Sequence, residues 1–529
     1  MAIGLQCRPL MSLLIRSPWQ RHLWLALTAV LLAILLTLIV PRHAPADSLP
    51  ETAVRFSIPS GYVGESQQLV LETAVSNATI LFTTDGTTPT PNNGHRYSNP
   101  IFLDAAVPNV TVIRARVETA DATLHPITDA SYIIGIANPL PIVSLVVEPT
   151  HLWDETTGIY QHPEEQGIEW ERPISLTYVG VERETAVSIP AGLRIHGQFS
   201  RSYAKKSFRL YFRQEYGASR LEQPMFPDSL RTSFKRLVLH ASGQDSSQLP
   251  TNWTLIRNQL VARLAQQTNA LATHSQPALL FINGEPWGHY YLREHINGTL
   301  LQEGYGAETA DLVDTPARRE ENPADITPAY ADWDQLTGFI ASRDLADDAN
   351  YRFVATQVDL DSFIDYTILQ IYSANFDWPF TNMKQFRTTT QGGRWQWILW
   401  DSDLSLGLKP WSDVGQNTLE QALDPTYTAA VDINTNGNDT ILLRGLLQNE
   451  AFRMRFLTRA DELLNTVLAP EPVIAEIDRL AAEIEPAIGM ENGRWQGDTA
   501  AWHNHIVQLR DFAQQRPAIM RQHLNETLR

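Results

Sequence analysis

Cysteine is almost absent from this chain of 529 residues, in which Cys7 is the only one. A single cysteine excludes an internal disulfide and a zinc site built from thiolates. Two hydrolase signatures are also missing, the Gly-x-Ser-x-Gly elbow and the His-Glu-x-x-His zinc motif. Basic residues are in deficit, with 41 against 59 acidic ones and a net charge of −18. This balance argues against a general nucleic-acid-binding protein, which needs a basic face to displace counterions.

Charge is missing altogether from one stretch near the N-terminus. Leu23 to Val40 is a run of 18 uncharged residues, and as a helix it would span roughly 27 Å, enough for a hydrocarbon core. Three arginines precede it, so we expect residues 1–22 to be cytoplasmic and the body of the protein to lie outside. We expect residues 23–40 to be an uncleaved transmembrane helix or signal anchor. The alternative is secretion after cleavage near Ala44-Pro45-Ala46.

A short linker and a β-rich module follow this apolar run. Residues 41–51 are polar and rich in proline and alanine, as is typical of linkers. Thr79–Thr83 and residues 110–117 have strand patterns, and Asp85-Gly86 predicts a turn. The side chains of Arg114 and Arg116 share one strand face, which we expect to reach solvent. Residues 52–136 therefore predict a small antiparallel β-sandwich.

From residue 138 to residue 529 the pattern becomes α+β. Hairpins are predicted for residues 191–197 with 206–212, and for 279–285 with 288–292. Apolar periodicity predicts helices, and the long ones make up a helical C-terminal region. The helical stretches are residues 254–267, 362–373, 461–485 and 502–524.

Two polar elements could carry chemistry. Asp377 and Asn382 form an Asp-x4-Asn pair, whereas Asp401 and Asp403 end an aromatic strand. Phosphoryl transfer uses a carboxylate base together with a carboxamide and a carboxylate that hold Mg²⁺. We assign Asp377 as base and Asn382, Asp401 and Asp403 as metal ligands. Two alternatives stay open: Asp401 caps a turn, or Asp401 and Asp403 are the carboxylates of an inverting glycosidase.

A phosphate-binding cation is expected on the strand of residues 206–212. Lys206 shares its strand face with apolar residues and points inward, whereas Lys205 points the other way and is expected to be solvated. The preceding turn contains Gly197, Ser200 and Arg201, and its backbone N–H groups could cover phosphates.

Further downstream, Glu294 could pair with Lys206 or contact a nucleotide, and an ordinary ion pair with Arg257 is the alternative. Three histidines, His196, His240 and His295, stand beside apolar residues, and we expect them to be structural.

Two resemblances to known families follow from these motifs. Residues 80–90 with Tyr97 and residues 113–115 resemble the accessory β-sandwich at the C-terminus of chitobiases, which implies a spacer or a carbohydrate contact. From about Leu140 onwards the chain resembles the spore-coat protein CotH family of atypical protein kinases. The segments that carry this second resemblance are Arg194-Ile195-His196-Gly197, Lys205-Lys206-Ser207-Phe208, Asn375-Phe376-Asp377-Trp378 and Trp400-Asp401-Ser402-Asp403.

The CotH resemblance implies a degenerate two-lobed protein-kinase-like domain that uses ATP with Mg²⁺ (or Mn²⁺). By position, Lys206 or Lys205 would hold phosphates, Asp377 would be the base, and Asn382 and Asp401 would hold the metal. Many members of the family have Asp where Asn252 stands, which puts that position in doubt.

These observations lead to one hypothesis and one alternative for the function. The hypothesis is a membrane-anchored, outward-facing kinase that phosphorylates Ser or Thr of an envelope or surface protein. The alternative is a non-catalytic CotH-like scaffold or a glycan-binding protein of the cell surface or coat.

Overall fold

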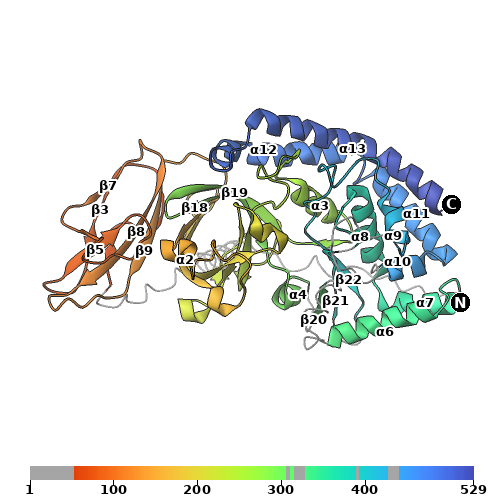
Figure 1. The fold of residues 1–529 in the computed structure, drawn as a ribbon, viewed down its shortest axis with the longest axis horizontal. Helices are drawn as coiled ribbons and strands as arrows, with labels where there is room; N and C mark the ends of the chain where they lie inside the picture. Colours follow the sequence, from red (N-terminus) through yellow and green to blue (C-terminus); the bar gives the residue numbers. More distant parts are fainter. Residues whose placement is uncertain are drawn as a thin grey trace, which may run out of the picture.

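The computed structural model describes residues 53–305, 310–314, 328–379, 381–388, 392–426 and 440–528 (Figure 1). The predicted cytoplasmic segment (1–22), membrane helix or anchor (23–40) and linker (41–51) lie outside the described residues. Within the described ranges, the helices are all too short or too polar to cross a membrane.

The N-terminal region is built from β-strands around its own apolar core. Its main sheet has the order β2-β9-β8-β5-β6, and β1-β4 and β3-β7 form two smaller pairs. The predicted strands are confirmed as β5 and β8, but β2 pairs parallel with β9, so a wholly antiparallel arrangement is wrong at that edge. The bounds are β1 Arg55–Phe56, β2 Gly61–Val63, β3 Gln67–Leu69, β4 Leu71–Glu72, β5 Thr79–Thr83, β6 His95–Arg96, β7 Ile101–Leu103, β8 Asn109–Glu118 and β9 Thr128–Ile134.

A closed barrel follows, with the strand order β10-β11-β12-β13-β16-β19-β18. Alternation along β13 sends Phe208 and Leu210 into the barrel core and Arg209 to its outer wall. Both predicted hairpins are confirmed, as β12 with β13 and β18 with β19. The bounds are β10 Ile142–Val146, β11 Arg172–Val179, β12 Ala186–His196, β13 Ser207–Tyr211, β16 Arg236–His240, β18 Ser275–Ile282 and β19 Glu285–Glu294.

Short elements connect and close the barrel. They are α2 Pro149–Trp153, η1 Ile168–Trp170, η2 Phe199–Ser202, η3 Gln214–Tyr216, the paired strands β14 Leu221–Glu222 and β15 Ser233–Phe234, and α4 Gly298–Gly304.

The C-terminal part combines helices with a four-stranded sheet of order β17-β22-β21-β20. The two longest helices, α12 and α13, run side by side from the barrel to the C-terminus, and α12 also contacts β19 (Figure 1). The bounds are α3 Arg257–Ala265, β17 Leu271–Ala272, β20 Ala310–Asp314, α6 Pro328–Ser342, α7 Asp348–Gln357, α8 Leu360–Ser373, β21 Lys384–Thr388, β22 Gln396–Leu399, α9 Thr418–Leu423, α10 Ile441–Leu446, α11 Glu450–Asn465, α12 Pro470–Trp495 and α13 Thr499–Leu528.

One predicted helix is divided in the structure. The stretch 461–485 belongs to two helices, because α11 ends at Asn465 and α12 begins at Pro470. Proline has no backbone N–H to donate to the preceding turn, so it starts a helix more readily than it continues one. The predicted helices 362–373 and 502–524 are confirmed within α8 and α13.

The β-rich region packs directly against the barrel. Arg114 was expected to reach solvent, but its side chain is 13% exposed and bonds Asp129 at 3.0 Å and Glu148 at 3.4 Å. That expectation is wrong because the barrel covers this strand face. Beside the ion pairs, Ser144 Oγ donates to Ser131 Oγ at 3.0 Å. The chain is thus a mixed α+β protein with an N-terminal β-rich region.

Candidate functional site

The loop after α8 holds Asp377 in a fixed place. Asn375 Nδ2 donates to Gln370 Oε1 at 2.8 Å, and Asn375 Oδ1 accepts from the backbone N–H of Asp377 at 3.2 Å. Phe376 N donates to Leu404 O at 2.9 Å. These bonds tie the loop both to its own helix and to the segment that follows β22.

The second polar element follows β22 and is anchored on α3. Ser402 stands between Asp401 and Asp403, and its backbone N–H donates to Asn258 Oδ1 at 2.9 Å. Its carbonyl accepts from Ser405 Oγ at 2.6 Å. The strand and these two bonds together fix the direction of both aspartates.

The two elements meet at Asn382. Its Nδ2 donates to Asp377 Oδ2 at 2.9 Å and to the Asp401 carbonyl at 3.5 Å. Asn382 has φ 59° and Asp401 has φ 54°, so both are left-handed, a conformation that costs most side chains energy and is most accessible to Asn and Asp. Strained residues of this kind concentrate at functional sites. The structure therefore brings together Asp377, Asn382 and Asp401, while their chemical roles stay predictions.

Asp403 faces a histidine that the sequence suggested was structural. His240 Nε2 lies 3.7 Å from Asp403 Oδ2, and one donor atom each of His240, Asp401 and Asp403 lie within 4.8 Å of one another. Neither carboxylate oxygen of Asp403 has a hydrogen-bond partner among the residues that the structure describes. The loop after β16 closes over this carboxylate, because a Cβ at Gly243 would stand 2.4 Å from Asp403 Oδ2.

Burial raises the pKa of all three carboxyl groups, and the charge of Asp401 adds to the effect on the other two. Burial, followed by the charge of Asp401, raises the pKa of Asp377 to about 7. Burial also raises the pKa of Asp403 well above its usual value, and Asp401 adds to the effect. The pKa of Asp401 is raised by burial, against the opposing charges of Arg293 and Lys384. Raised pKa values in three neighbouring carboxyl groups mean that too little positive charge lies near them to stabilise their ionised forms.

A divalent cation fits this deficit. Asp403 offers two buried oxygens without partners, and His240 offers an imidazole whose Nδ1 also has no hydrogen bond among the described residues. Carboxylate oxygens suit Mg²⁺ and Mn²⁺, whereas an imidazole ligand is better suited to a transition metal. The residues that could hold the ion are Asp401, Asp403, His240 and Asn382.

Lys206 points inward as predicted, but its ammonium group meets carbonyls. Lys206 Nζ donates to Arg201 O at 2.6 Å and to Tyr203 O at 2.8 Å, and lies 5.3 Å from the Tyr160 ring centre. Among the described residues it has no hydrogen bond or ion pair with the carboxylates of the site. Its predicted role on phosphates therefore has no support from the geometry.

Lys205 was expected to be solvated, and this is wrong. Its side chain is fully buried, and its Nζ lies 2.7 Å from Glu491 Oε1 of α12. Glu491 Oε2 also accepts from the backbone N–H of His289 at 2.8 Å. The outward face of the strand is covered by α12, so Lys205 is buried in an ion pair, and its predicted role on phosphates stays untested.

The turn before β13 is occupied by its own contacts. The Arg201 guanidinium donates to the carbonyls of Gly197 at 2.6 Å, Pro163 at 2.6 Å and Ile195 at 3.0 Å. Arg201 is buried and therefore holds the loop together. Gly197 has φ 108°, and a Cβ there would stand 2.3 Å from Ser200 Oγ, so the turn requires glycine. The roles predicted for Gly197, Ser200 and Arg201 on phosphates stay untested.

Glu294 pairs with neither of the residues considered for it. Its Oε1 lies 2.7 Å from Arg231 Nη1, and its Oε2 accepts from the backbone N–H of His274 at 3.0 Å. Arg257 instead pairs with Asp245 at 2.6 Å. The alternative for Glu294 was an ordinary ion pair with Arg257. The structure has an ordinary ion pair, but its partner is Arg231.

Asn252, where many CotH proteins have Asp, links two loops. Its Nδ2 donates to Gly407 O at 2.9 Å, and its Oδ1 accepts from Lys409 N at 2.8 Å. The amide satisfies a donor and an acceptor at once, which a carboxylate could not do.

A cavity of about 340 Å³ lies on the outer wall of the barrel, beside the carboxylates. Its charged lining consists of Arg209, Arg293, Lys384 and Glu294, together with His196 and His295, and we call it the cationic pocket. Arg209 Nη2 donates to His196 Nδ1 at 2.7 Å. Lys384 Nζ lies 4.0 Å from the centre of the Trp400 ring.

Sequence reasoning did not identify the cations of this pocket. The available signal was alternation, because Arg209 interrupts the apolar face pattern of a strand that otherwise reads as buried. Barrel closure brings Arg209 and Arg293 together from β13 and β19, and Lys384 is added from β21. No motif spacing in the sequence encodes that meeting.

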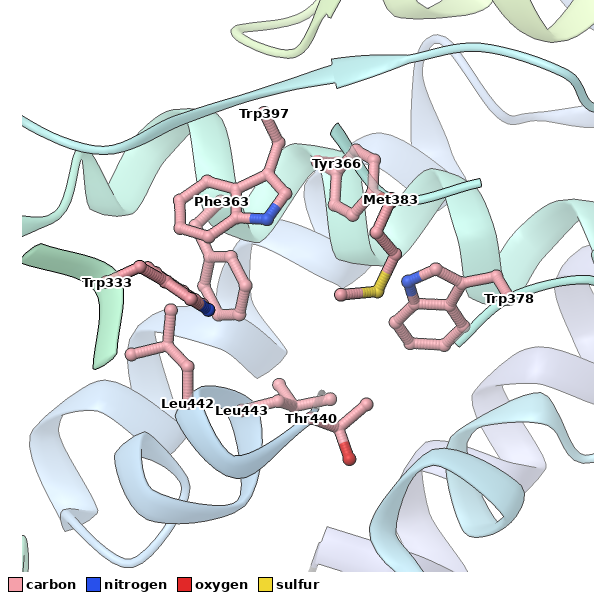
Figure 2. Close-up of a pocket in the computed structure, with 9 residues that line it drawn as sticks. All are labelled: Trp333, Phe363, Tyr366, Trp378, Met383, Trp397, Thr440, Leu442 and Leu443. Atoms are coloured by element: carbon pink, nitrogen blue, oxygen red, sulfur yellow. The ribbon is translucent and has the colours of Figure 1, made fainter. Parts of the chain in front are cut away.

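A second hollow lies behind the loop of Asp377 and is lined by apolar and aromatic side chains (Figure 2). Trp378 and Met383 reach it from the residues that follow Asp377 and Asn382. Its volume is about 10 Å³, space for one water at most. Its aromatic side chains pack the site from behind and leave no room for a nucleotide there.

Comparison with known families agrees with this arrangement. Residues 193–520 match the family described as CotH kinase protein, and residues 58–124 match the chitobiase/beta-hexosaminidase C-terminal domain. No curated protein matches the chain. The first match covers more than half of the 529 residues and contains the carboxylates, Asn382 and the cationic pocket. The chain therefore belongs to the CotH kinase protein family, with a chitobiase-type β-rich domain before it.

Proposed function

We propose that this protein transfers the γ-phosphoryl group of ATP to a Ser or Thr hydroxyl of a protein acceptor. The observation that supports this most is the meeting of Asp377 and Asn382 with Asp401 and Asp403, from two separate elements, in one buried cluster. A base, a carboxamide and paired carboxylates are the groups that phosphoryl transfer uses.

Asp377 is the general base in this proposal. Its carboxylate accepts the proton of the acceptor hydroxyl while the hydroxyl oxygen forms a bond to the γ-phosphorus. The bond between that phosphorus and the β–γ bridging oxygen breaks, and ADP leaves with the electron pair. Burial raises the pKa of Asp377 to about 7, which suits a base that works near neutral pH.

Asn382 orients the base and leaves its own carbonyl oxygen for a cation. Its Nδ2 is engaged by Asp377 at 2.9 Å, so its Oδ1 is the remaining ligand atom. Asp401, Asp403 and His240 complete the set that would hold Mg²⁺ or Mn²⁺. When bound, such an ion neutralises the phosphate oxygens and the developing charge on the leaving group.

The proposal extends to the architecture and to the place of action. We assign the barrel and the helical part to the two lobes of a degenerate kinase-like domain. The apolar run Leu23–Val40 supports a membrane anchor with the body outside the cytoplasm, so the acceptor would be an envelope or surface protein. In this proposal the β-rich domain contacts carbohydrate.

The test is transfer of label from γ-labelled ATP by the full-length protein in detergent, with Mg²⁺ or Mn²⁺ and a panel of protein acceptors. We expect incorporation by the wild type and none by Asp401→Asn, with unchanged folding by circular dichroism. Glu285→Gln, at an exposed position of the barrel, is the control and should transfer normally. No incorporation by the wild type with either ion would contradict the proposal.

The non-catalytic alternative makes a different prediction in the same assay. A scaffold or glycan-binding protein would give no incorporation and would be retained on a glycan resin without nucleotide. An ATP-dependent rise in melting temperature, together with transfer, would exclude it.

A further inference from the structure

Arginines gather around one tyrosine on the outer face of the barrel. The guanidinium carbons of Arg194, Arg213 and Arg236 lie 4.5, 4.9 and 5.3 Å from the centre of the Tyr211 ring. Strand pairing produces this gathering, because Tyr211 of β13 is the cross-strand partner of Arg236 of β16. In the same way, Arg194 of β12 is the cross-strand partner of Arg209. We call Arg194, Arg213 and Arg236, with Tyr211 beneath them, the arginine patch.

Acidic side chains offset only part of the charge of the arginine patch. Glu171 is buried, and it pairs with Arg194 Nη2 at 2.7 Å and with Arg213 Nε at 2.8 Å. One carboxylate thus serves two guanidinium groups. Glu215 is exposed and lies 3.8 Å from Arg213, too far for a hydrogen bond.

Arg236 is the cation of the patch that has no carboxylate beside it. Its guanidinium makes no hydrogen bond or ion pair with any residue that the structure describes, and the residue is exposed. Partial burial lowers the pKa of Arg236, and the charges of Arg209, Arg213 and Arg194 contribute to the lowering. Like charges at this separation repel one another, so an anion on the patch would stabilise all of them.

The patch is held ready for carboxylates. Glu171 accepts from Arg194 Nε at 2.8 Å and from Arg213 Nε at 2.8 Å, so both guanidinium planes are fixed from below. Guanidinium groups bind carboxylates through two parallel hydrogen bonds, and stacking on an aromatic ring leaves their N–H edges free to do so. Groups that are ordered before binding lose less entropy when a ligand arrives.

The charge of the whole molecule selects the kind of anion. The patch extends over three neighbouring strands, about 10 Å at the usual strand spacing, which exceeds the size of a single small ion. A long polyanion such as a nucleic acid, or an anionic membrane, would also face the rest of a protein whose net charge is −18. A short acidic segment of a protein would face only the patch.

We propose that the arginine patch docks an acidic segment of a partner protein, and that this partner is the phosphoryl acceptor. The role of acceptor rests on the proposed phosphoryl transfer, whereas the docking itself does not. Arg209 connects the patch to the site, because it donates to the Tyr211 hydroxyl at 3.2 Å and also lines the cationic pocket. Trp400 lines the same pocket and directly precedes Asp401. A chain docked on the patch therefore lies beside the pocket that adjoins the carboxylates.

Fluorescence anisotropy with the full-length protein in detergent tests the docking. The probe is a labelled peptide of alternating Asp and Glu with a central Ser, and the same peptide with Asn and Gln is the neutral control. We expect the acidic peptide alone to bind, and its affinity to fall with added salt. Arg236→Gln should weaken binding about threefold or more, Arg236→Glu should weaken it further, and Arg236→Lys, which keeps the charge, should lose less than Arg236→Gln.

Arg352→Gln is the matched control for these variants. It also removes one positive charge, from an exposed position of α7, and should bind the acidic peptide as the wild type does. Three results would overturn the docking: equal affinity of the wild type for the acidic and the neutral peptide, wild-type affinity in Arg236→Glu, or tighter binding of a single-stranded RNA than of the acidic peptide.

Transfer kinetics separate this inference from the proposed function. With the acidic peptide as acceptor, Arg236→Glu should raise the KM for the peptide, with a much smaller effect on kcat and on the KM for ATP. An unchanged KM for the peptide would overturn the acceptor assignment, and so would equal kcat/KM of the wild type for the acidic and the neutral peptide. A wild type that binds the acidic peptide but transfers label to no acceptor would contradict the proposed function and leave the docking standing.

Discussion

Asp403 is the residue at which stability and function conflict most clearly. Its two carboxylate oxygens are buried without hydrogen-bond partners among the described residues, and Asp401 repels its charge. An unsatisfied buried polar group costs about 1–3 kcal/mol. The protein carries this cost in the absence of a cation, and a bound cation would remove it.

We therefore expect Asp403→Asn to raise the free energy of unfolding of the metal-free protein by about 1–3 kcal/mol. The same variant should lose the rise in melting temperature that Mn²⁺ gives the wild type, because one ligand is gone. Denaturant unfolding with a chelator and with Mn²⁺ measures both effects. Asp511→Asn, at an exposed position of α13, should change neither. Destabilisation by Asp403→Asn without metal would contradict this view of the site.

We expect His240 to give the proposed cation site a preference among metal ions. Its Nε2 lies 3.7 Å from Asp403 Oδ2. A transition metal gains more from an imidazole ligand than Mg²⁺ does. We expect His240→Gln to weaken Mn²⁺ binding about tenfold and Mg²⁺ binding much less, as measured by Mn²⁺ paramagnetic resonance and by competition with Mg²⁺. Equal losses for the two ions would show that His240 is not a ligand.

At the scale of elements, one buried ion pair fastens the C-terminal helices to the barrel. Lys205 and Glu491 are both fully buried, 2.7 Å apart, and they join the start of β13 to α12. Removing one partner leaves the other charge unpaired, which typically costs about 3–5 kcal/mol, whereas replacing both is often neutral.

A double-mutant cycle measures this pair. Lys205→Met should lower the free energy of unfolding by about 3–5 kcal/mol, and addition of Glu491→Gln should restore a large part of it. The control is Lys409→Met, because Lys409 forms an exposed pair with Asp413 that should contribute at most about 1 kcal/mol. Additive losses in the Lys205 and Glu491 variants would mean that the pair is not coupled.

The elements also show what a sequence can and cannot predict. Asp377 and Asn382 were predicted to act together because they form an Asp-x4-Asn pair, with four residues between them. Asp401 was predicted as a site residue because an apolar strand ends just before it. Lys206 points inward as predicted, but Lys205 was wrongly expected to be solvated, since alternation on a strand gives the face but not what covers it. The partner of Lys205 stands 286 positions away on α12. The sequence around Arg293 contains no motif that predicts a pocket residue, because only closure of the barrel places Arg293 in the pocket wall.

For the whole molecule, the question is whether the β-rich domain is a tethered module or part of one body. Val110, Val112 and Ile133 of that domain share an apolar cluster with Ile142 and Phe281 of the barrel. Glu148 adds polar contacts, since it accepts from the backbone N–H of Thr88 at 2.7 Å and pairs with Arg114 at 3.4 Å. A continuous core of this kind favours joint unfolding of the two parts.

Phe281→Ala tests this joint core. The side chain is 2% exposed, and its truncation should lower the free energy of unfolding by about 3–5 kcal/mol. Hydrogen exchange should show faster exchange in β8 of the β-rich domain and in β10 of the barrel alike. Phe102→Ala, which removes a side chain that is 57% exposed, should affect neither strand. Faster exchange in the barrel alone would show that the two parts open separately.

The carboxylate cluster as a phosphoryl-transfer site is tested most directly by the turnover of Asp377→Asn with labelled ATP, Mn²⁺ and an acceptor protein. Loss of a general base should lower kcat about 10²- to 10⁴-fold, while KM for ATP stays near the wild-type value. Asp361→Asn, an exposed change on α8, should leave both constants unaltered. A kcat for Asp377→Asn equal to that of the wild type would contradict the account.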